Sequence, residues 1–265
     1  MTTEPVSADP LKRRVIRSGL LRAEDRNTTV PTLAPRFKLS TLTLAGADMQ
    51  SEPVLSAGRT TMRRKHREPA WTTMLAQGCP VAATLPAHCR LALPIEHMDA
   101  IPEDLILQLT AALSESGVSA ERLDLEFSES SLTADSDTLY YSLAALRDVG
   151  VGLVLSGLGT GVTSLTLLRD RVLGGLLTGL KLDRLLLLRD PMHAEAGHVL
   201  ARTIVKLGGD FGLTTRADGI DTQETLAFLQ DIGCQEGRGS VLGKPQTLPL
   251  FVSSYFQPDR SRRQS

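Results

Sequence analysis

Residues 151–161 read V-G-L-V-L-S-G-L-G-T-G, a short apolar run followed by a glycine-rich turn. An apolar run bounded by glycine is typical of a strand covered on both faces, as in parallel sheets. We therefore predict a buried strand over Val151–Leu155, a turn over Ser156–Gly161 and the start of a helix over Val162–Asp170. Ligands of α/β folds lie at the carboxyl ends of strands, so a functional site is expected beside this turn.

Similar strand-and-helix units are predicted on both sides of this stretch. Further strands are expected over Phe37–Leu44, Val54–Thr60, Arg90–Ile95, Leu123–Phe127, Leu177–Leu182, Gly212–Arg216 and Arg238–Leu242, with a turn over Gly46–Glu52. Helices are expected over Ala70–Gln77, Pro102–Ser116, Ser136–Asp148, Val162–Arg171, Met192–Gly209 and Thr222–Ile232. Strands that alternate with helices through short turns indicate a parallel sheet. The strand count approaches eight, which favours a closed (β/α)8 barrel.

The composition is that of an ordinary soluble protein. The chain has 265 residues, of which 42% are hydrophobic and 22% charged, and its formal net charge is −1. A balance so close to neutral predicts no general attraction to nucleic acid or to a membrane surface. No apolar run is long enough to predict a transmembrane helix, and Met1–Pro10 lacks the apolar core of a signal peptide. Three cysteines without C-x-x-C spacing favour reduced thiols and a cytoplasmic location.

Three segments are expected along the chain. Residues 1–35 are polar and are predicted to be partly disordered, although Leu11–Arg26 could form a basic docking helix. Residues 36–256 form the barrel domain, and residues 257–265 form a disordered tail. The basic run Arg59–Arg67 is either a solvated loop or an anion site.

The glycine-rich turn superficially imitates a dinucleotide-binding fingerprint. Gly157, Gly159 and Gly161 lie between a predicted strand and a predicted helix, and Asp183 follows the next strand where a ribose-binding acid would lie. However, the third glycine comes one residue early, and several strand–helix units precede the turn. The pattern therefore argues against dinucleotide binding.

Ionisable residues gather where the predicted strands end. In a barrel these positions converge on one mouth, where carboxylates and a lysine could hold metal ions and phosphates. Helix capping is the alternative explanation, particularly for Asp221 with Glu224 three residues later. His193 and His198 are five residues apart, so they share no helix face and predict no metal pair. The residues at strand ends are Glu126, Glu129, Lys181, Asp183, Asp218 and Asp221.

Five segments then resemble one known family. They are L-D-L-E-F-S-E-S-S-L (123–132), L-A-A-L-R-D-V-G-V-G-L-V-L-S-G-L-G-T-G-V-T-S-L (143–165), G-L-K-L-D-R (179–184), R-A-D-G-I-D-T (216–222) and G-C-Q-E-G-R-G-S-V-L-G-K-P (233–245). In order and spacing they are similar to the EAL domain family over about residues 90–250. That resemblance implies that this chain is a modified TIM-like (β/α)8 barrel. It also implies that the chain is a cyclic di-GMP phosphodiesterase or a degenerate relative of one.

Some of the family's functional positions are kept in this sequence. The glutamate of the family's L-E-x-T-E segment falls on Glu126, and the lysine of its K-I-D segment falls on Lys181. The two glutamates of its A-E-G-V-E-T segment fall on Asp218 and Asp221, which are acidic but one methylene shorter.

Other positions are lost. The aspartate pair of the family's D-D-F-G-T-G segment falls on Ser156 and Gly157, and the asparagine of its V-N-L-S strand falls on Pro94. Its E-A-L-L-R segment is not recognisable in Val54–Met62, where we expect it. The glutamine of the family's late Q-G-Y segment falls on Arg238, and its tyrosine falls on Ser240.

These losses predict a chain that is not an enzyme. The family's chemistry uses two divalent cations bridged by carboxylates, and the remaining oxygen ligands are too few for Mg²⁺. We therefore expect no catalytic residues and no metal or other cofactor, with Mg²⁺ or Mn²⁺ relevant only to residual activity. The chain is also shorter than the family between Arg59 and Leu93, which leaves open a barrel that is incomplete in its first half. By resemblance, Val162–Gly175 is the expected homodimer surface.

Three functions remain open. The first is a catalytically inactive EAL-like regulator that binds a protein partner in cyclic di-GMP-related signalling. The second is a cyclic di-GMP receptor without turnover. The third is a weak metal-dependent phosphodiesterase that uses Glu126, Asp218 and Asp221. The receptor would meet the ligand's phosphates with Arg59, Arg63, Lys181, Arg238 and Lys244.

Overall fold

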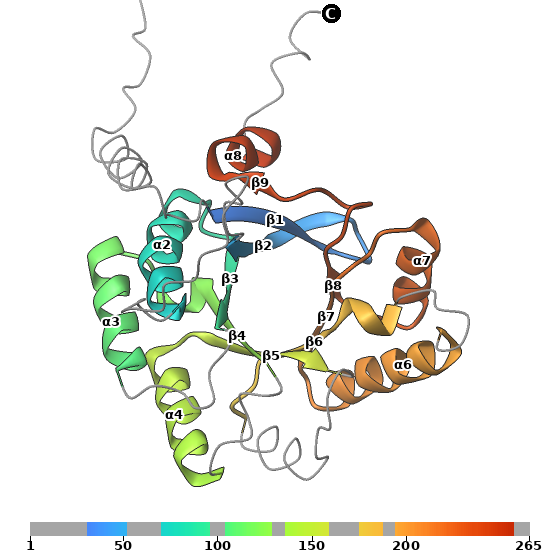
Figure 1. The fold of residues 1–265 in the computed structure, drawn as a ribbon, viewed down its shortest axis with the longest axis horizontal. Coiled ribbons are helices and arrows are strands. Elements are labelled where there is room, and N and C mark those ends of the chain that lie inside the picture. Colours follow the sequence, from blue (N-terminus) through green and yellow to red (C-terminus); the bar gives the residue numbers. More distant parts are fainter. Residues whose placement is uncertain are drawn as a thin grey trace, which may run out of the picture.

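The computed structural model describes residues 31–51, 70–95, 104–128, 136–158, 175–187 and 194–256. Within these ranges eight strands close into a barrel, with the order β2-β3-β4-β5-β6-β7-β8-β1 and a further pairing of β1 with β2 (Figure 1). The short strand β9 (Gln246–Thr247) pairs antiparallel with Thr32 and Leu33 of β1. The barrel strands are β1 (Pro31–Lys38), β2 (Thr43–Ser51), β3 (Arg90–Ile95), β4 (Leu123–Ser128), β5 (Gly152–Leu158), β6 (Gly179–Leu182), β7 (Thr214–Ala217) and β8 (Glu236–Gly237).

One strand of the barrel runs against the others. Strand β1 is antiparallel to both β2 and β8, whereas β2 to β8 are parallel to their neighbours. The chain therefore begins the barrel with a hairpin, and its remaining strands follow the βα pattern. The carboxyl ends of β2 to β8 consequently meet at one opening, which we call the mouth, and their amino ends meet at the other, which we call the base.

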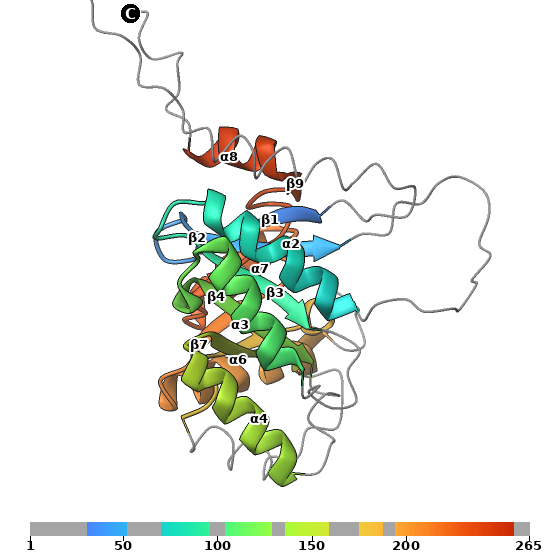
Figure 2. The same cartoon turned by 90° about the vertical axis from the view of Figure 1, so that its left-hand side faces the viewer.

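Helices surround the barrel on its outer side (Figures 1 and 2). Helix α8 packs outside β1, with Phe251 fully buried and its ring 4.9 Å from that of Tyr255. Short 3-10 turns lie at Ala120–Arg122 and Arg184–Leu187. The helices are α2 (Ala70–Thr84), α3 (Leu105–Ser116), α4 (Ser136–Val149), α6 (Ala194–Asp210), α7 (Gln223–Asp231) and α8 (Leu248–Phe256).

The apolar core lies between the strands and the helices. Side chains alternate between the two faces of a strand. Along β4, Leu123, Leu125 and Phe127 belong to the apolar core, whereas Asp124 and Glu126 belong to the barrel interior. Branched apolar residues dominate the interior of an ordinary TIM barrel. The interior of this barrel is largely charged.

Most of the sequence-based elements agree with the structure, but the first and last strands do not. The turn predicted over Gly46–Glu52 is wrong, because Gly46 lies inside β2 and pairs with Arg90 of β3. The last strand of the barrel is Glu236–Gly237 rather than Arg238–Leu242. The incomplete first half is also wrong, because the barrel is closed. Helix α8 was not predicted.

Several predicted segments lie outside the described residues. They are the strand at Val54–Thr60, the helix at Val162–Arg171, the basic run Arg59–Arg67, residues 1–30 and the tail 257–265. Residues 31–35 of the predicted N-terminal segment are described and form the start of β1. In the described part of the chain, no helix is both long and apolar enough to span a membrane.

Gly46 is required by close approach rather than by a turn. A Cβ atom there would lie 2.6 Å from Arg36 Nη2 and would overlap the carbonyl oxygen of Arg90. We expect Gly46→Ala to lower the free energy of unfolding by at least about 2 kcal/mol, since backbone and a buried guanidinium would both have to shift. Urea unfolding followed by circular dichroism measures this change.

The matched control is Gly209→Ala in α6, where an added Cβ meets no atom within 4 Å. Alanine in a helix interior is more stable than glycine by about 0.5–1 kcal/mol, so this variant should be slightly more stable than the original chain. A Gly46→Ala protein as stable as the original would contradict the packing described for β2.

Candidate functional site

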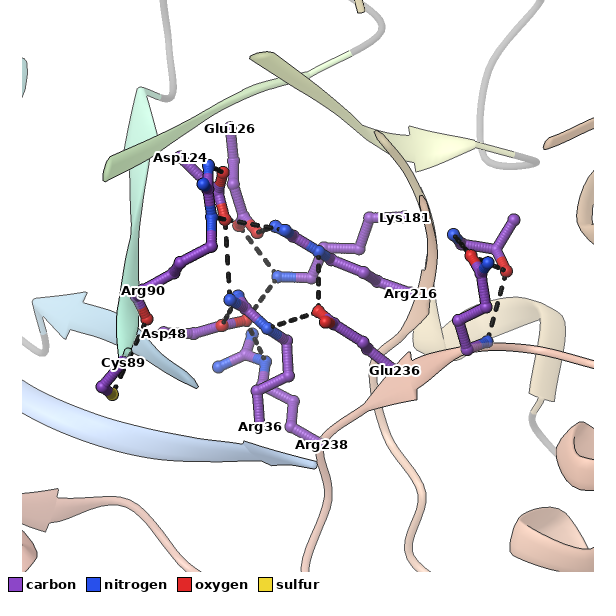
Figure 3. Close-up of polar contacts among 12 residues, drawn as sticks. Arg36, Asp48, Cys89, Arg90, Asp124, Glu126, Lys181, Arg216, Glu236 and Arg238 are labelled. Atoms are coloured by element: carbon purple, nitrogen blue, oxygen red, sulfur yellow. Dashed lines mark hydrogen bonds and ion pairs between the residues drawn. The ribbon is translucent and has the colours of Figure 1, made fainter. Parts of the chain in front are cut away.

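The barrel interior holds a network of charged side chains that spans the barrel from mouth to base (Figure 3). Six of them are at most 5% exposed, which is rare for charged residues unless they are paired. Asp218 lies in the turn after β7, where Gly219 has a φ of 77°. Arg238 directly follows β8. The network consists of Arg36, Asp48, Arg90, Asp124, Glu126, Lys181, Arg216, Asp218, Glu236 and Arg238.

At the mouth, the ammonium group of Lys181 lies among three carboxylates. Its Nζ is 3.0 Å from Asp48 Oδ2, 2.8 Å from Glu126 Oε2 and 3.3 Å from Asp218 Oδ2. These carboxylates come from β2, β4 and the turn after β7, so the closed barrel is what brings them together. Lys181 acts as a cation with three oxygen partners.

A second cation, the guanidinium of Arg238, contacts two of these three carboxylates. Its Nη2 donates to Asp218 Oδ2 at 2.6 Å and its Nε to Asp218 Oδ1, a bidentate pair. Arg238 Nε also lies 3.2 Å from Asp48 Oδ2. Asp48 and Asp218 are therefore each paired with both Lys181 and Arg238.

These contacts move the pKa values of the mouth residues in opposite directions. Burial raises the pKa of Asp48, but Lys181, Arg36 and Arg238 outweigh it and hold that pKa well below its usual range. Burial also raises the pKa of Glu126, and there it outweighs Lys181 because the charges of Asp48 and Asp218 add to it. Burial lowers the pKa of Lys181, but the neighbouring carboxylates raise it overall.

Below the mouth, arginines and carboxylates continue the network towards the base. Arg36 reaches Asp48 with Nη1 at 2.6 Å and Glu236 with Nε at 2.9 Å. Arg216 Nη2 donates to Asp124 at 2.7 Å, and Arg90 also pairs with Asp124. Burial raises the pKa of Asp124, yet Arg216, Arg90 and Arg36 lower it from 3.8 to about 2.

The network is balanced in formal charge. Five cations, namely three at the base side and two at the mouth, face five carboxylates. Burying an unpaired charge is far more costly than burying a paired one. The balance explains how a barrel of this size tolerates ten ionisable groups in its interior.

The structure brings together three of the four acidic or basic positions predicted as remnants. Lys181 contacts both Glu126 and Asp218, whereas Asp221 faces the loop after β8. Asp221 Oδ1 accepts hydrogen bonds from the backbone N–H and the hydroxyl of Ser240 at 3.0 and 2.8 Å. The two bonds lower the pKa of Asp221, with a smaller contribution from Arg184 at 3.5 Å.

The positions predicted as lost offer no carboxylate to the mouth. Ser156 donates its hydroxyl to the carbonyl oxygen of Phe127 at 3.0 Å. Gly157 has a positive φ of 75°. Pro94 lies opposite Glu126 in the β3–β4 register. Strands β3 and β5 therefore supply backbone and a hydroxyl where the resemblance expects an amide and two carboxylates.

The remaining predicted residues lie apart from the network. Lys244 is exposed after β8, and Asp183 accepts a hydrogen bond from the backbone N–H of Leu185 at 2.8 Å. His198 stacks on Phe228 with ring centroids 4.1 Å apart. Arg59, Arg63, Glu129, His193 and nearly all of Val162–Gly175 lie outside the described residues.

Sequence reasoning missed Asp48, Arg36 and Arg216. The signal for Asp48 was present, because the buried apolar Ala47 and Met49 flank it with the alternation of a strand. The segment was instead interpreted as a turn on account of its glycine. A search of the described residues finds no group of three or more His, Cys, Asp or Glu side chains arranged to hold a metal ion.

Comparison with known proteins gives a family match. The sequence profile of the EAL domain matches residues 61–245, more than half of the chain. Cyclic di-GMP phosphodiesterase PA2567 of Pseudomonas aeruginosa is 28% identical over 168 residues, which cover 63% of this chain and 28% of that protein. Cyclic di-GMP phosphodiesterase NbdA of the same organism is 32% identical over 152 residues, covering 57% and 18%.

Solved structures show the same fold. A structure titled PaMucR phosphodiesterase, c-di-GMP complex, superposes with a TM-score of 0.70 at 21% identity, covering 91% of this chain and 99% of that one. The EAL domain of Mycobacterium smegmatis DcpA gives 0.68 at 22% identity, covering 86% and 96%. This chain thus spans less than a third of the length of the two curated relatives, but nearly all of these two solved chains.

The lowered pKa values of Asp48 and Asp124 predict that the free energy of unfolding falls as the pH becomes acidic. Stability from a carboxylate with a lowered folded-state pKa is present above its unfolded value and is lost as the pH falls through the folded value. For Asp124 this window runs from about pH 4 to about pH 2, and its shift corresponds to about 2 kcal/mol. Urea unfolding between pH 7 and pH 2.5 should show the loss.

Asp124→Asn should remove this part of the pH dependence and cost about 3–5 kcal/mol at pH 7, since it removes the carboxylate that pairs with Arg90 and one of the partners of Arg216 and of Arg36. The control is Asp210→Asn, whose carboxylate forms an exposed pair with Lys206, and it should change stability by less than about 0.5 kcal/mol. Equal effects of the two variants would refute the energetic role given to the network.

Proposed function

This chain belongs to the EAL domain family, and we propose that it is a non-hydrolysing member, a regulator that acts in cyclic di-GMP signalling by binding a protein partner. The observation that carries the proposal is the pairing of Asp48, Glu126 and Asp218 with side-chain cations. These are the carboxylates that a pair of divalent cations would need.

Arg238 is the decisive residue in this argument. The family resemblance includes a lysine at position 181, so the contacts of Lys181 alone do not set this chain apart. Arg238 replaces the glutamine of the family's Q-G-Y segment and adds a full positive charge against Asp218 and Asp48. Two unit charges of like sign 4 Å apart repel by about 4 kcal/mol near a protein surface, and a divalent cation doubles that.

The ligand set supports the same proposal. Mg²⁺ requires nearly complete octahedral oxygen coordination. Asp48 is the acidic residue of the strand before β3, so it is the best candidate for the glutamate of the E-A-L-L-R segment, one methylene shorter. Ser156, Gly157 and Pro94 supply none of the missing carboxylate or amide oxygens. The residues present therefore do not fit a two-metal centre.

The curated relatives supply the signalling context. PA2567 and NbdA are named cyclic di-GMP phosphodiesterases, and this chain matches only part of each. We propose that this chain acts in the same signalling system as these relatives. We also propose that it does not hydrolyse cyclic di-GMP, because the residues at its mouth differ.

A second candidate function is a cyclic di-GMP receptor without turnover. Arg238 Nη1 is buried and has no hydrogen-bond acceptor among the described residues. A phosphate oxygen at the mouth would satisfy this donor in a charge-assisted hydrogen bond. The contact would need no metal ion, because the guanidinium supplies the positive charge.

The hydrolysis assay tests the main proposal. Purified full-length chain incubated with cyclic di-GMP and either Mg²⁺ or Mn²⁺ should release no linear dinucleotide above the buffer blank, measured by liquid chromatography. Glu126→Ala should give the same blank value. Turnover that disappears in Glu126→Ala would refute the proposal and leave the weak phosphodiesterase as the function.

Calorimetric titration of cyclic di-GMP separates the two binding functions. A receptor should bind it equally with and without Mg²⁺, and Arg238→Gln should weaken binding about tenfold through loss of a charge-assisted contact. Arg202→Gln, an exposed arginine of α6, is the control and should bind as the original chain does. Absence of heat in both buffers would exclude the receptor and favour a protein-binding function.

A further inference from the structure

Side-chain donors occupy nearly every carboxylate oxygen at the mouth. Asp48 Oδ1 accepts from an arginine of the lower network at 2.6 Å, and Asp48 Oδ2 accepts from Lys181 Nζ at 3.0 Å. Glu126 Oε2 accepts from the same ammonium group at 2.8 Å, and Arg238 donates to both oxygens of Asp218. Of the six oxygens on these three carboxylates, only Glu126 Oε1 has no hydrogen-bond partner among the described residues.

Two of the carboxylates bridge two positive centres (Figure 3). Asp48 Oδ2 lies 3.0 Å from Lys181 Nζ and 3.2 Å from Arg238 Nε. Asp218 Oδ2 lies 3.3 Å from Lys181 Nζ and 2.6 Å from Arg238 Nη2. Bridging carboxylates are also how a protein holds two divalent cations close together. At this mouth both bridged cations are side chains.

The backbone holds Arg238 in place beside its carboxylate partner. The N–H of Arg238 donates to the carbonyl oxygen of Ala217 at 3.0 Å, and its own carbonyl oxygen accepts from the N–H of Ile220 at 3.1 Å. Ala217 and Ile220 flank Asp218 in the turn after β7. The guanidinium and the carboxylate that it holds therefore belong to two backbone segments that are bonded to each other.

The positive charge of Arg238 is permanent. Arginine stays protonated in proteins. Burial lowers the pKa of Arg238, but its hydrogen bond with Asp218 and the charge of Asp48 raise that pKa above its usual range. A group tethered beside its partner also competes at a high effective concentration. A divalent cation from solution would have to displace this guanidinium to reach the oxygens of Asp48 and Asp218.

Removal of the guanidinium would free oxygens of two carboxylates. Asp218 Oδ1 would lose its side-chain donor, and Asp218 Oδ2 and Asp48 Oδ2 would keep only Lys181. Mg²⁺ usually takes one or two protein carboxylates and retains several waters. These oxygens could therefore serve one divalent cation, although the residues present do not fit two.

We propose that Arg238 is the built-in cation of the mouth, and that it makes the mouth indifferent to divalent cations. Its guanidinium takes the oxygens of Asp218 and Asp48 that a divalent cation would take. The proposal deepens the proposed function and rests on it, because it makes any regulatory binding at this mouth independent of Mg²⁺.

The test is binding of Mn²⁺ to the full-length chain, measured by electron paramagnetic resonance of the free ion. Arg238→Gln should bind Mn²⁺ at least about tenfold more tightly than the original chain, because a like charge is removed and carboxylate oxygens are freed. Arg238→Lys keeps the positive charge and should bind Mn²⁺ no more tightly than the original chain. Equal affinities of Arg238→Gln and the original chain would overturn the proposal.

The matched control is Arg184→Gln. Arg184 is an exposed arginine that follows β6 and lies 3.5 Å from Asp221, so it touches none of the three mouth carboxylates in the described structure. Its removal should leave Mn²⁺ binding as in the original chain. Adding Asp218→Asn to Arg238→Gln should abolish the gain, which assigns the ion to the freed oxygens. A gain that survives Asp218→Asn would overturn that assignment.

The original chain keeps the proposal testable if Arg238→Gln does not fold, as judged by circular dichroism. Saturable Mn²⁺ binding by the original chain that disappears in Asp218→Asn would overturn it. The proposed function fails separately, through hydrolysis of cyclic di-GMP that depends on Glu126. A chain that neither hydrolyses cyclic di-GMP nor binds Mn²⁺ more tightly after Arg238→Gln would keep the proposed function and lose only the role given to Arg238.

Discussion

The structure depends on charge balance inside a closed barrel. Side chains of both signs occupy an interior that TIM barrels ordinarily fill with branched apolar residues. Each charge there is tolerable only because its partners lie within a few ångströms. Those partners come from strands far apart in the sequence, as with Asp48 of β2 and Lys181 of β6, 3.0 Å apart. The barrel must therefore close in one register for the network to be neutral, so the network favours one arrangement of the strands over any slipped one.

The same constraint explains where small residues are needed. Gly46 and Gly152 lie where a side chain would collide with Arg36, Arg90 or Asp124. An interior built from arginines requires space beside them, and glycine in the neighbouring strand provides it. The apolar stabilisation lies outside this layer, between the strands and the helices, where Leu91, Leu125 and Leu153 are fully buried.

The regular part of the chain was predictable and the hairpin that begins the barrel was not. Strands β4 to β7 are bounded by turns and followed by helical patterns, so their periodicity identifies them. In β2, glycine beside Asp48 imitates a turn, and only the pairing of Gly46 with Arg90 reveals a strand. The resemblance located Glu126, Lys181 and Asp218. It could not locate the pairing of Arg36 and Arg216 with Glu236, because ion pairs between distant strands leave no local pattern.

Side-chain cations hold the negative charge of the mouth. Asp48, Glu126 and Asp218 face two side-chain cations, so one carboxylate lacks a full counter-charge from the mouth alone. Burial, together with the charges of Asp48 and Asp218, raises the pKa of Glu126. Arg36 of the lower network lies 2.6 Å from Asp48 and supplies that counter-charge. Lysine and arginine side chains thus balance the carboxylates at both ends of the barrel, and a ligand at either end must match a charge that the protein has already set.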